Sequence, residues 1–142
     1  MNNEPIMKFH IDADPATITE MECPYGSISV IPFTGWVKSE LFSGEILPGA
    51  VDVQIENPAG VRNMCAKYVF RGKDRAGQDC CLFVENNGWF SGAEKHSKVL
   101  NACPRFLTDS AELGEYFCQN RFRSEVRCEV RGLEIWIFDV CA

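Results

Sequence analysis

Hydrophobic and polar residues alternate through much of this chain, and the clearest run lies between residues 44 and 90. From Ala50 to Glu56, valine or isoleucine alternates with polar residues. A period of two with β-branched residues is typical of a half-buried strand. Residues 57–60 (Asn-Pro-Ala-Gly) predict a type I turn, because proline sets φ at its second position. Val61 to Arg71 and Asp79 to Glu85 predict two more strands, so we expect an antiparallel meander.

The rest of the chain shows the same alternation in shorter runs. Residues 86–88 (Asn-Asn-Gly) predict a turn after the meander, because Asn and Gly tolerate positive φ. Asp109 followed by Glu112 resembles a capping box and predicts one short helix. The other predicted strands are Ile6 to Ile11, Thr17 to Met21, Ser27 to Lys38 with a bend at Pro32 and Gly35, Ser97 to Phe106, Phe122 to Arg131 and Glu134 to Val140.

Seven or eight strands, one short helix and no βαβ rhythm predict an all-β fold. Closely spaced strands with turn signals fit a barrel or a sandwich. Sequential strands usually pair, and the meander connections are short, so we expect an antiparallel β-barrel of about eight strands. With 142 residues the chain is expected to form a single domain over residues 1–142.

The turn lengths also suggest a register for the meander. If the turns are tight, Asp52 lies opposite Cys65 and Cys65 opposite Glu85. One face then carries Asp52, Lys67 and Glu85, and the other carries apolar side chains that include Met64 and Tyr68. A slip of one residue would exchange the faces of a strand. Which face lines the barrel interior is left open by the sequence.

Composition narrows the possible partners. The hydrophobic residues make up 46% of the chain, which argues against disorder. The net charge of −6 disfavours binding to nucleic acid or to an anionic membrane. No apolar run is long enough to span a bilayer, and the first ten residues do not resemble a signal peptide. We therefore expect a cytoplasmic protein without nucleic-acid or membrane partners.

The eight cysteines form no C-x-x-C pair, and the chain has only two histidines. These spacings do not predict a zinc site, so we expect no metal. In the cytosol the thiols stay reduced, and most of the cysteines are interpreted as small hydrophobic residues of the core. No glycine-rich phosphate loop precedes a helix, so no nucleotide or other cofactor is expected.

Three segments resemble the pattern of domain-of-unknown-function family 3237. They are residues 44–52 (Gly-Glu-Ile-Leu-Pro-Gly-Ala-Val-Asp), 66–68 (Ala-Lys-Tyr) and 84–88 (Val-Glu-Asn-Asn-Gly). The family pattern has glycine where this chain has Ala50 and arginine where it has Lys67. A lysine does not make the bidentate contact of an arginine, which weakens any implied anion-binding role. The resemblance implies a small lipocalin-like or allene-oxide-cyclase-like barrel that often self-associates, with no established activity.

Asp52, Lys67 and Glu85 are the candidate catalytic residues. If their face lined the lumen, one of the two carboxylates would have a raised pKa and would act as a general acid or base. The alternative is an exterior ladder of cross-strand ion pairs that contributes little to stability. Both interpretations stay open from the sequence.

Tyr68, Met64, Trp89 and Phe90 are the candidate ligand-binding residues. Tyr68 lies on the apolar face, where its hydroxyl either orients a ligand or belongs to an ordinary core tyrosine. Trp89 and Phe90 are expected in a loop, as a lid over the barrel mouth, as a contact between subunits or as a plug.

Three functions are compatible with these patterns. The first is the binding of a small, largely apolar molecule in the barrel lumen. The second is a cofactor-independent acid–base enzyme, such as an isomerase, cyclase or hydrolase. The third is a structural subunit. A homodimer or higher homo-oligomer is expected because Glu134 to Val140 is apolar on both faces.

Overall fold

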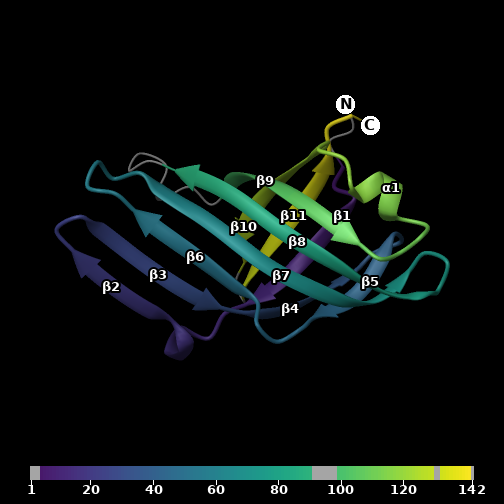
Figure 1. Cartoon of the computed structure of the whole chain (residues 1–142), viewed down its shortest axis with the longest axis horizontal. Helices are drawn as coiled ribbons and strands as arrows, with labels where there is room; N and C mark the ends of the chain where they lie inside the picture. The colour runs from purple at the N-terminus through teal and green to yellow at the C-terminus, as the bar shows by residue number, and fades with distance from the viewer. Residues whose placement is uncertain (1–3, 91–98, 130–131, 142) are drawn as a thin grey trace.

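The computed structural model describes residues 4–90, 99–129 and 132–141. It contains eleven strands in one antiparallel sheet, a short 3₁₀-helix η1 (Pro15–Thr17) and a short helix α1 (Gly114–Phe117) (Figure 1). The strands are β1 (Met7–Asp12), β2 (Thr19–Cys23), β3 (Gly26–Pro32), β4 (Thr34–Lys38), β5 (Phe42–Ile46), β6 (Val51–Glu56), β7 (Arg62–Asp74), β8 (Asp79–Phe90), β9 (Val99–Thr108), β10 (Phe122–Cys128) and β11 (Leu133–Asp139).

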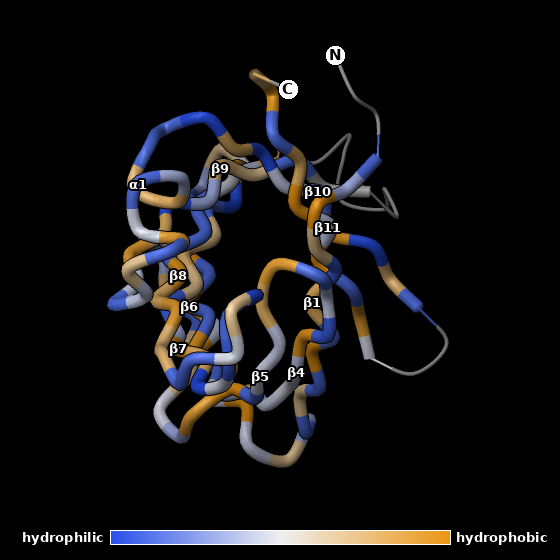
Figure 2. The backbone as a smooth tube through the Cα atoms, turned by 90° about the vertical axis from the view of Figure 1, so that its right-hand side faces the viewer, coloured by the Kyte–Doolittle hydropathy of each residue, from blue (hydrophilic) through white to orange (hydrophobic). Residues whose placement is uncertain are grey.

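Eight of the strands close into a barrel. The order runs from β7 through β5, β4, β1, β11, β10, β9 and β8, and β8 pairs again with β7. Figure 2 shows these strands as a ring seen close to the barrel axis. The predicted antiparallel barrel of about eight strands is therefore confirmed. Its closure depends on the pairing of β1 with β11, which joins the two ends of the chain.

The remaining three strands form an arm that extends the sheet outside the ring. One edge of β7 pairs with β6 in its first half and with β5 in its second half. Because β6 occupies only the first half, β3 and β2 continue the sheet outward from it, and β2 is the outer edge. Figure 1 shows β2, β3 and β6 side by side next to β7.

Aromatic side chains fill much of the interior. Phe9 packs on Phe70 at 4.7 Å between ring centroids, and Tyr68 contacts both rings. A second group joins α1 to the barrel wall, where Phe117 lies 5.2 Å from Phe106 and 5.6 Å from Phe122. Buried aromatic rings contribute large apolar areas and edge-to-face contacts, so these groups account for much of the stability.

The register between β6 and β7 differs by one residue from the prediction. Asp52 lies opposite Ala66 and not opposite Cys65. The predicted turn is present, since the Gly60 amide donates to the Asn57 carbonyl at 3.0 Å. However, Gly60 adopts a φ of +84°, and Asn57 pairs with Val61. A type I turn followed by a left-handed glycine adds one residue to the loop, and this addition moves Asp52 to the opposite face.

The hairpin between β7 and β8 is longer than predicted. Lys73 lies opposite Asp79, which is a shift of two residues and leaves the faces unchanged. The turn predicted at residues 86–88 is wrong, because β8 continues to Phe90. Gly88 has no positive φ, and a Cβ there would meet the Cβ of Ala102 at 3.0 Å. This glycine therefore serves the close approach of β8 to β9.

The predicted capping role of Asp109 is also wrong. The helix begins after Leu113, which makes no side-chain cap. The Asp109 carboxylate instead accepts a hydrogen bond from the Cys81 backbone amide at 2.7 Å, and this bond fixes the position of the first residues of β8. Ser110 supports the turn before the helix, because its hydroxyl accepts the Leu113 amide at 3.2 Å.

The described part of the chain contains no helix that is long and apolar enough to cross a bilayer. All eight cysteines are free, and only Cys80 is fully buried. Five of them are exposed, so the interpretation of the cysteines as core residues is wrong for most of them.

Candidate functional site

A row of polar side chains lies on the inner face of the sheet, where β6, β7 and β8 are adjacent. Asp52 on β6 lies opposite Ala66 on β7, and Ala66 lies opposite Asn86 on β8. Residues directly opposite one another point to the same side of a sheet. Ala66 and Asn86 are buried, as is Tyr68, the next inward residue along β7. The pleat of three adjacent strands thus directs Asp52, Tyr68 and Asn86 toward the interior.

A chain of hydrogen bonds leads to Asp52. The Gln54 amide donates to Asp52 Oδ2 at 2.9 Å, and Arg62 donates to Gln54 Oε1 at 3.1 Å. Arg62 Nε also pairs with Glu56 Oε1 at 3.3 Å. These contacts hold one carboxylate oxygen of Asp52 in place. The other oxygen, Oδ1, is buried and has no hydrogen-bond partner among the described residues.

Burial raises the pKa of Asp52 above the ordinary aspartate value. The hydrogen bond from Gln54, the positive charge of Arg62 and the backbone amide of Cys65 act in the opposite direction, but burial is the larger effect. A carboxyl group with a raised pKa gives up its proton less readily. Once ionised, it is a stronger base than an exposed aspartate.

Tyr68 is the second group with an unpartnered polar atom. Its ring is held edge-on against Phe33, Phe9 and Phe70, with centroids 5.0, 6.2 and 5.6 Å away. The hydroxyl is buried and has no hydrogen-bond partner within the described ranges of the chain. Burial, and then the charge of Asp52, raise the pKa of Tyr68 far above its usual range, so the phenol keeps its proton.

Asn86 and Ser124 continue the polar lining around the barrel. The Ser124 hydroxyl donates to Asn86 Oδ1 at 3.0 Å, and both side chains are buried. Ser124 comes from β10, which is far from β8 in the sequence. This contact reaches across β9, which pairs with β8 on one side and with β10 on the other.

The predicted cluster of Asp52, Lys67 and Glu85 does not form. Lys67 is exposed and lies opposite Glu85 on the outer face, while Asp52 points inward. The hydrogen bond from Asn87 lowers the pKa of Glu85, and the charges of Lys67 and Arg105 contribute to this lowering. Lys67 and Glu85 thus lie opposite each other on the outer face, and of the three candidates only Asp52, on β6, points to the inner face of the sheet.

The predicted ligand-binding residues divide between the two faces. Met64 lies opposite Gln54 and Gly88 on the inner face, and Phe90 is buried on the same face of β8. Trp89 points outward and is 63% exposed. The prediction of a loop at Trp89 and Phe90 is wrong, because both belong to β8.

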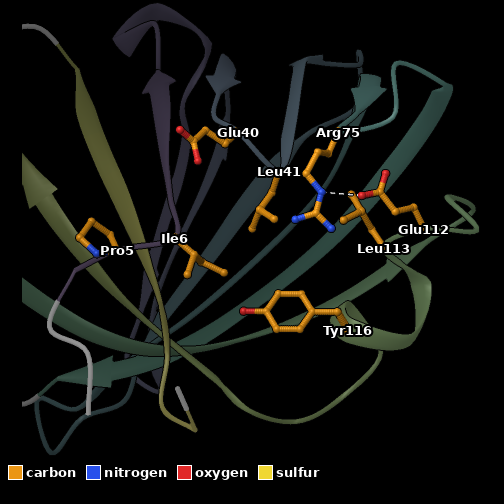
Figure 3. A pocket seen from close by; sticks show the side chains of 8 residues that line it. All are labelled: Pro5, Ile6, Glu40, Leu41, Arg75, Glu112, Leu113 and Tyr116. Atoms are coloured by element: carbon orange, nitrogen blue, oxygen red, sulfur yellow. Dashed lines mark hydrogen bonds and ion pairs between the residues drawn. The ribbon is translucent and has the colours of Figure 1, made fainter.

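The structure has a hollow of about 710 Å³ at the end of the barrel next to α1 (Figure 3). Ile6, Leu41 and Tyr116 point into it. Its polar groups are largely paired with one another or with neighbours. Arg75 bonds Glu112 at 2.6 Å, and the Tyr116 hydroxyl donates to Asp139 at 2.7 Å. This end therefore has fewer unused hydrogen-bonding groups than the inner face near Asp52.

Another hollow, of about 590 Å³, lies beside the segment 48–51. Phe33 lines this hollow and also contacts the ring of Tyr68 at 5.0 Å. Phe33 thus contacts both Tyr68 and the hollow.

The inner face offers a carboxylate, a phenol, an amide and a hydroxyl beside an apolar interior. These groups suit a ligand with an apolar body and one or two hydrogen-bonding atoms. Among the residues that the structure describes, no three His, Cys, Asp or Glu side chains are grouped as for a metal ion.

Four residues of this site were not expected from the sequence: Gln54, Arg62, Asn86 and Ser124. Gln54 shares the period-two face of Asp52, and that spacing is a signal for it. Asn86 was assigned to a turn. No signal in the local sequence connects Ser124 with Asn86.

Comparisons with known proteins cover most of the chain. The model of the family described as protein of unknown function (DUF3237) matches residues 1–131. A UPF0311 protein of Clostridium acetobutylicum is 33% identical over 89 residues, which are 62% of this chain and 54% of that protein. The chain thus spans about half the length of the curated relative it matches.

Solved structures share the fold. A protein of unknown function from C. acetobutylicum has a TM-score of 0.75 at 23% identity, over 98% of this chain and 99% of its own. A protein of unknown function from Rhodopseudomonas palustris gives 0.74 at 24% identity, over 94% and 93%. A beta-barrel like protein from Acinetobacter baumannii gives 0.74 at 18% identity, over 96% and 93%. At these identities the likeness concerns the fold alone.

Proposed function

We propose that this chain, which belongs to the DUF3237 family of proteins of unknown function, binds a small, largely apolar molecule inside its barrel. One observation carries the proposal: Asp52 Oδ1 and the Tyr68 hydroxyl are both buried, and neither has a hydrogen-bond partner among the described residues. A buried polar atom without a partner costs stability. A ligand that bonds both atoms would remove this cost.

The chemistry of the two groups defines the ligand class. Ionised Asp52 accepts hydrogen bonds, and Tyr68 donates one, because its phenol stays protonated. The ligand would therefore carry a hydrogen-bond donor and an acceptor close together on an apolar body. The rings around Tyr68 would contact that body, as in the lumen of a lipocalin-like barrel. The hollow next to Phe33 is a possible entrance.

A matched pair of probes tests this proposal. 2-Naphthol carries one hydroxyl on an apolar ring system, and naphthalene has the same ring system without it. We expect 2-naphthol to bind more tightly, and Asp52→Leu to weaken only its binding, about tenfold or more. A hydrogen bond to a charged group contributes about 1.5–3 kcal/mol, and about 1.4 kcal/mol corresponds to tenfold.

Fluorescence titration measures both affinities. Glu85→Gln is the matched control, because it removes a carboxylate from the outer face of the same sheet and should leave both affinities unchanged. Equal loss of 2-naphthol binding in both variants, or equal affinity for the two probes, would contradict the proposed site.

The raised pKa of Asp52 favours acid–base catalysis as a second candidate function. Asp52 would remove a proton from the carbon next to a ketone. The C–H electron pair would then form a carbon–carbon double bond, and the carbonyl π pair would move to the oxygen, which Tyr68 hydrogen-bonds. Return of the proton to the opposite face of the same carbon inverts that centre and completes an isomerisation without a cofactor.

Exchange of the α-protons of 2-tetralone in D₂O, followed by NMR, measures this reaction. We expect faster exchange with the wild type than with Asp52→Asn, and an unchanged rate with Glu85→Gln. The same rate with wild type and Asp52→Asn would argue against catalysis and would leave the binding proposal to its own titration.

We also place the protein in the cytoplasm, as the sequence suggests. The support is that all eight cysteines are free thiols, which is the usual state in a reducing compartment.

A further inference from the structure

We propose that the outer face of β2, β3, β6, β7 and β8 is the contact surface for a second copy of this chain. Cross-strand pairing places two rows of side chains there, which we call the uncharged face. One row is Met21, Ile28, Ile55, Asn63 and Trp89, and the other is Thr19, Val30, Val53, Cys65, Asn87 and Cys103.

Large apolar side chains of this face are open to solvent. Met21 is 60% exposed, Ile55 is 51% exposed and Trp89 is 63% exposed. They lie in one row across five adjacent strands, with the uncharged residues Ile28 and Asn63 between them. Exposed apolar side chains grouped in this way on soluble proteins mark sites of interaction.

The shape of the uncharged face is suited to itself. Trp89 projects beside a hollow of about 410 Å³ that Val53, Ile55, Cys65 and Cys103 also line. A two-fold axis places the same surface patch on both partners. Each Trp89 would then enter the hollow of the other copy, in the way that buried aromatic anchors dominate many interfaces.

Charge favours a second copy over a charged partner. The chain has a net charge of −6, so two copies repel each other, and this repulsion is weakest where the contacting surfaces carry no charge. Neither of the two rows contains a charged side chain. The next row contains Lys67, Glu85 and Arg105, which would form a rim of mixed sign.

The open edge of β2 is a less suitable contact. Antiparallel pairing of two β2 strands about Met21 would place Glu20 of one copy opposite Glu22 of the other. Like charges directly opposite are destabilising, and charged residues commonly protect edge strands. The face of the arm therefore suits a second copy better than its edge.

A dimer was expected from the sequence because Glu134 to Val140 is apolar on both faces, but the outer face of this strand, β11, is already covered. Its outward Trp136 lies beneath Lys8 Nζ and Arg127, 4.2 and 3.7 Å from the ring centroid, and Arg123 lies 4.2 Å from the Phe138 centroid. Long cationic side chains of the same chain cover this strand. Three of the exposed large apolar side chains, Met21, Ile55 and Trp89, lie instead on the arm and on β8.

Sedimentation velocity at micromolar concentrations tests the proposal. We expect a wild-type dimer that Trp89→Glu converts largely to monomer. Leu107→Glu is the matched control, because Leu107 is 62% exposed on β9 outside the uncharged face and the charge change is identical. Burying a new unpaired carboxylate should weaken association at least about tenfold, which corresponds to about 1.4 kcal/mol.

Each outcome decides the question. The proposal is supported if the wild type and Leu107→Glu are dimers and Trp89→Glu is a monomer. A monomeric wild type, or equal effects of the two variants, overturns it. Circular dichroism checks folding, and Ile55→Asp replaces Trp89→Glu if that variant unfolds, with the same expected monomer.

Discussion

Replacing Tyr68 by phenylalanine should stabilise the protein without ligand. The substitution removes only the phenolic oxygen, and the ring would keep its contacts with Phe9, Phe33 and Phe70. In most buried tyrosines the hydroxyl has a hydrogen-bond partner, so the change to phenylalanine is destabilising. The Tyr68 hydroxyl is buried and has no partner among the described residues, and this reverses the expected sign.

The size of the effect follows from two terms. A buried hydroxyl without a partner costs about 1–3 kcal/mol of desolvation, and phenylalanine avoids this cost. Removal of one oxygen leaves a void of roughly 15 Å³, which costs about 0.4 kcal/mol at about 24 cal/mol per Å³. The net gain is therefore about 0.6–2.6 kcal/mol. In a domain of this size, each 1 kcal/mol should raise Tm by about 3 °C.

Urea denaturation followed by fluorescence measures the change, with Tyr116→Phe as the matched control. Its hydroxyl donates to the buried Asp139 carboxylate at 2.7 Å, beside Arg121. A hydrogen bond to a charged group contributes about 1.5–3 kcal/mol, so this variant should lose about 1.5 kcal/mol. The same chemical change thus has opposite effects at the two sites.

A loss of stability in Tyr68→Phe similar to that in Tyr116→Phe would refute the reasoning. It would mean that the Tyr68 hydroxyl is already hydrogen-bonded in the free protein. The hydroxyl would then not be available to a ligand, and the binding proposal would lose one of its two polar contacts.

Three further predictions concern pH, charge and packing. Burial makes folded Asp52 hold its proton to a higher pH than the unfolded chain does, so wild-type stability should fall as pH rises above the ordinary value of 3.8. Asp52→Asn has no carboxyl group at this position and does not lose stability in this way. The difference between its urea midpoint and that of the wild type should therefore increase between about pH 4 and 7. A difference between the two midpoints that does not change with pH would contradict the burial of Asp52. Lys67→Met should change the free energy of unfolding by less than about 1 kcal/mol at pH 5 and pH 8, since Lys67 is an exposed partner of Glu85, and a larger loss in denaturant titrations would contradict that placement. Gly88→Val should lower stability by about 1–3 kcal/mol in thermal unfolding, because its side chain meets β9, whereas Gly114→Ala has open space and should cost nothing.

Local sequence patterns identify most of the elements of this fold. Period-two alternation marks β1, β6, β7 and β10, and a run that is apolar on both faces marks β11. The predicted bend at Pro32 is the end of β3, so the single strand predicted over Ser27 to Lys38 is two strands, β3 and β4. The turn at residues 57–60 is recognisable because its proline and glycine meet steric requirements within four residues. The strands and the all-β class are therefore properties of short segments.

The faces of those strands are not local properties. Gly60 takes one residue of the hairpin into a left-handed conformation, and this single residue turns Asp52 inward, away from Lys67 and Glu85. Several backbone conformations are open to an Asn-Pro-Ala-Gly turn, and the packing of the surrounding sheet selects among them.

The sequence alone determined that this chain forms antiparallel strands with an apolar face, and it identified Asp52 and Tyr68 as candidates. Only the tertiary structure decided that these two side chains share the interior with Asn86 and Ser124. The physical reason is that alternation defines two faces of a strand but contains no information about distant partners. Those partners are set by the order and register of the strands in the sheet, which depend on the packing of the whole fold.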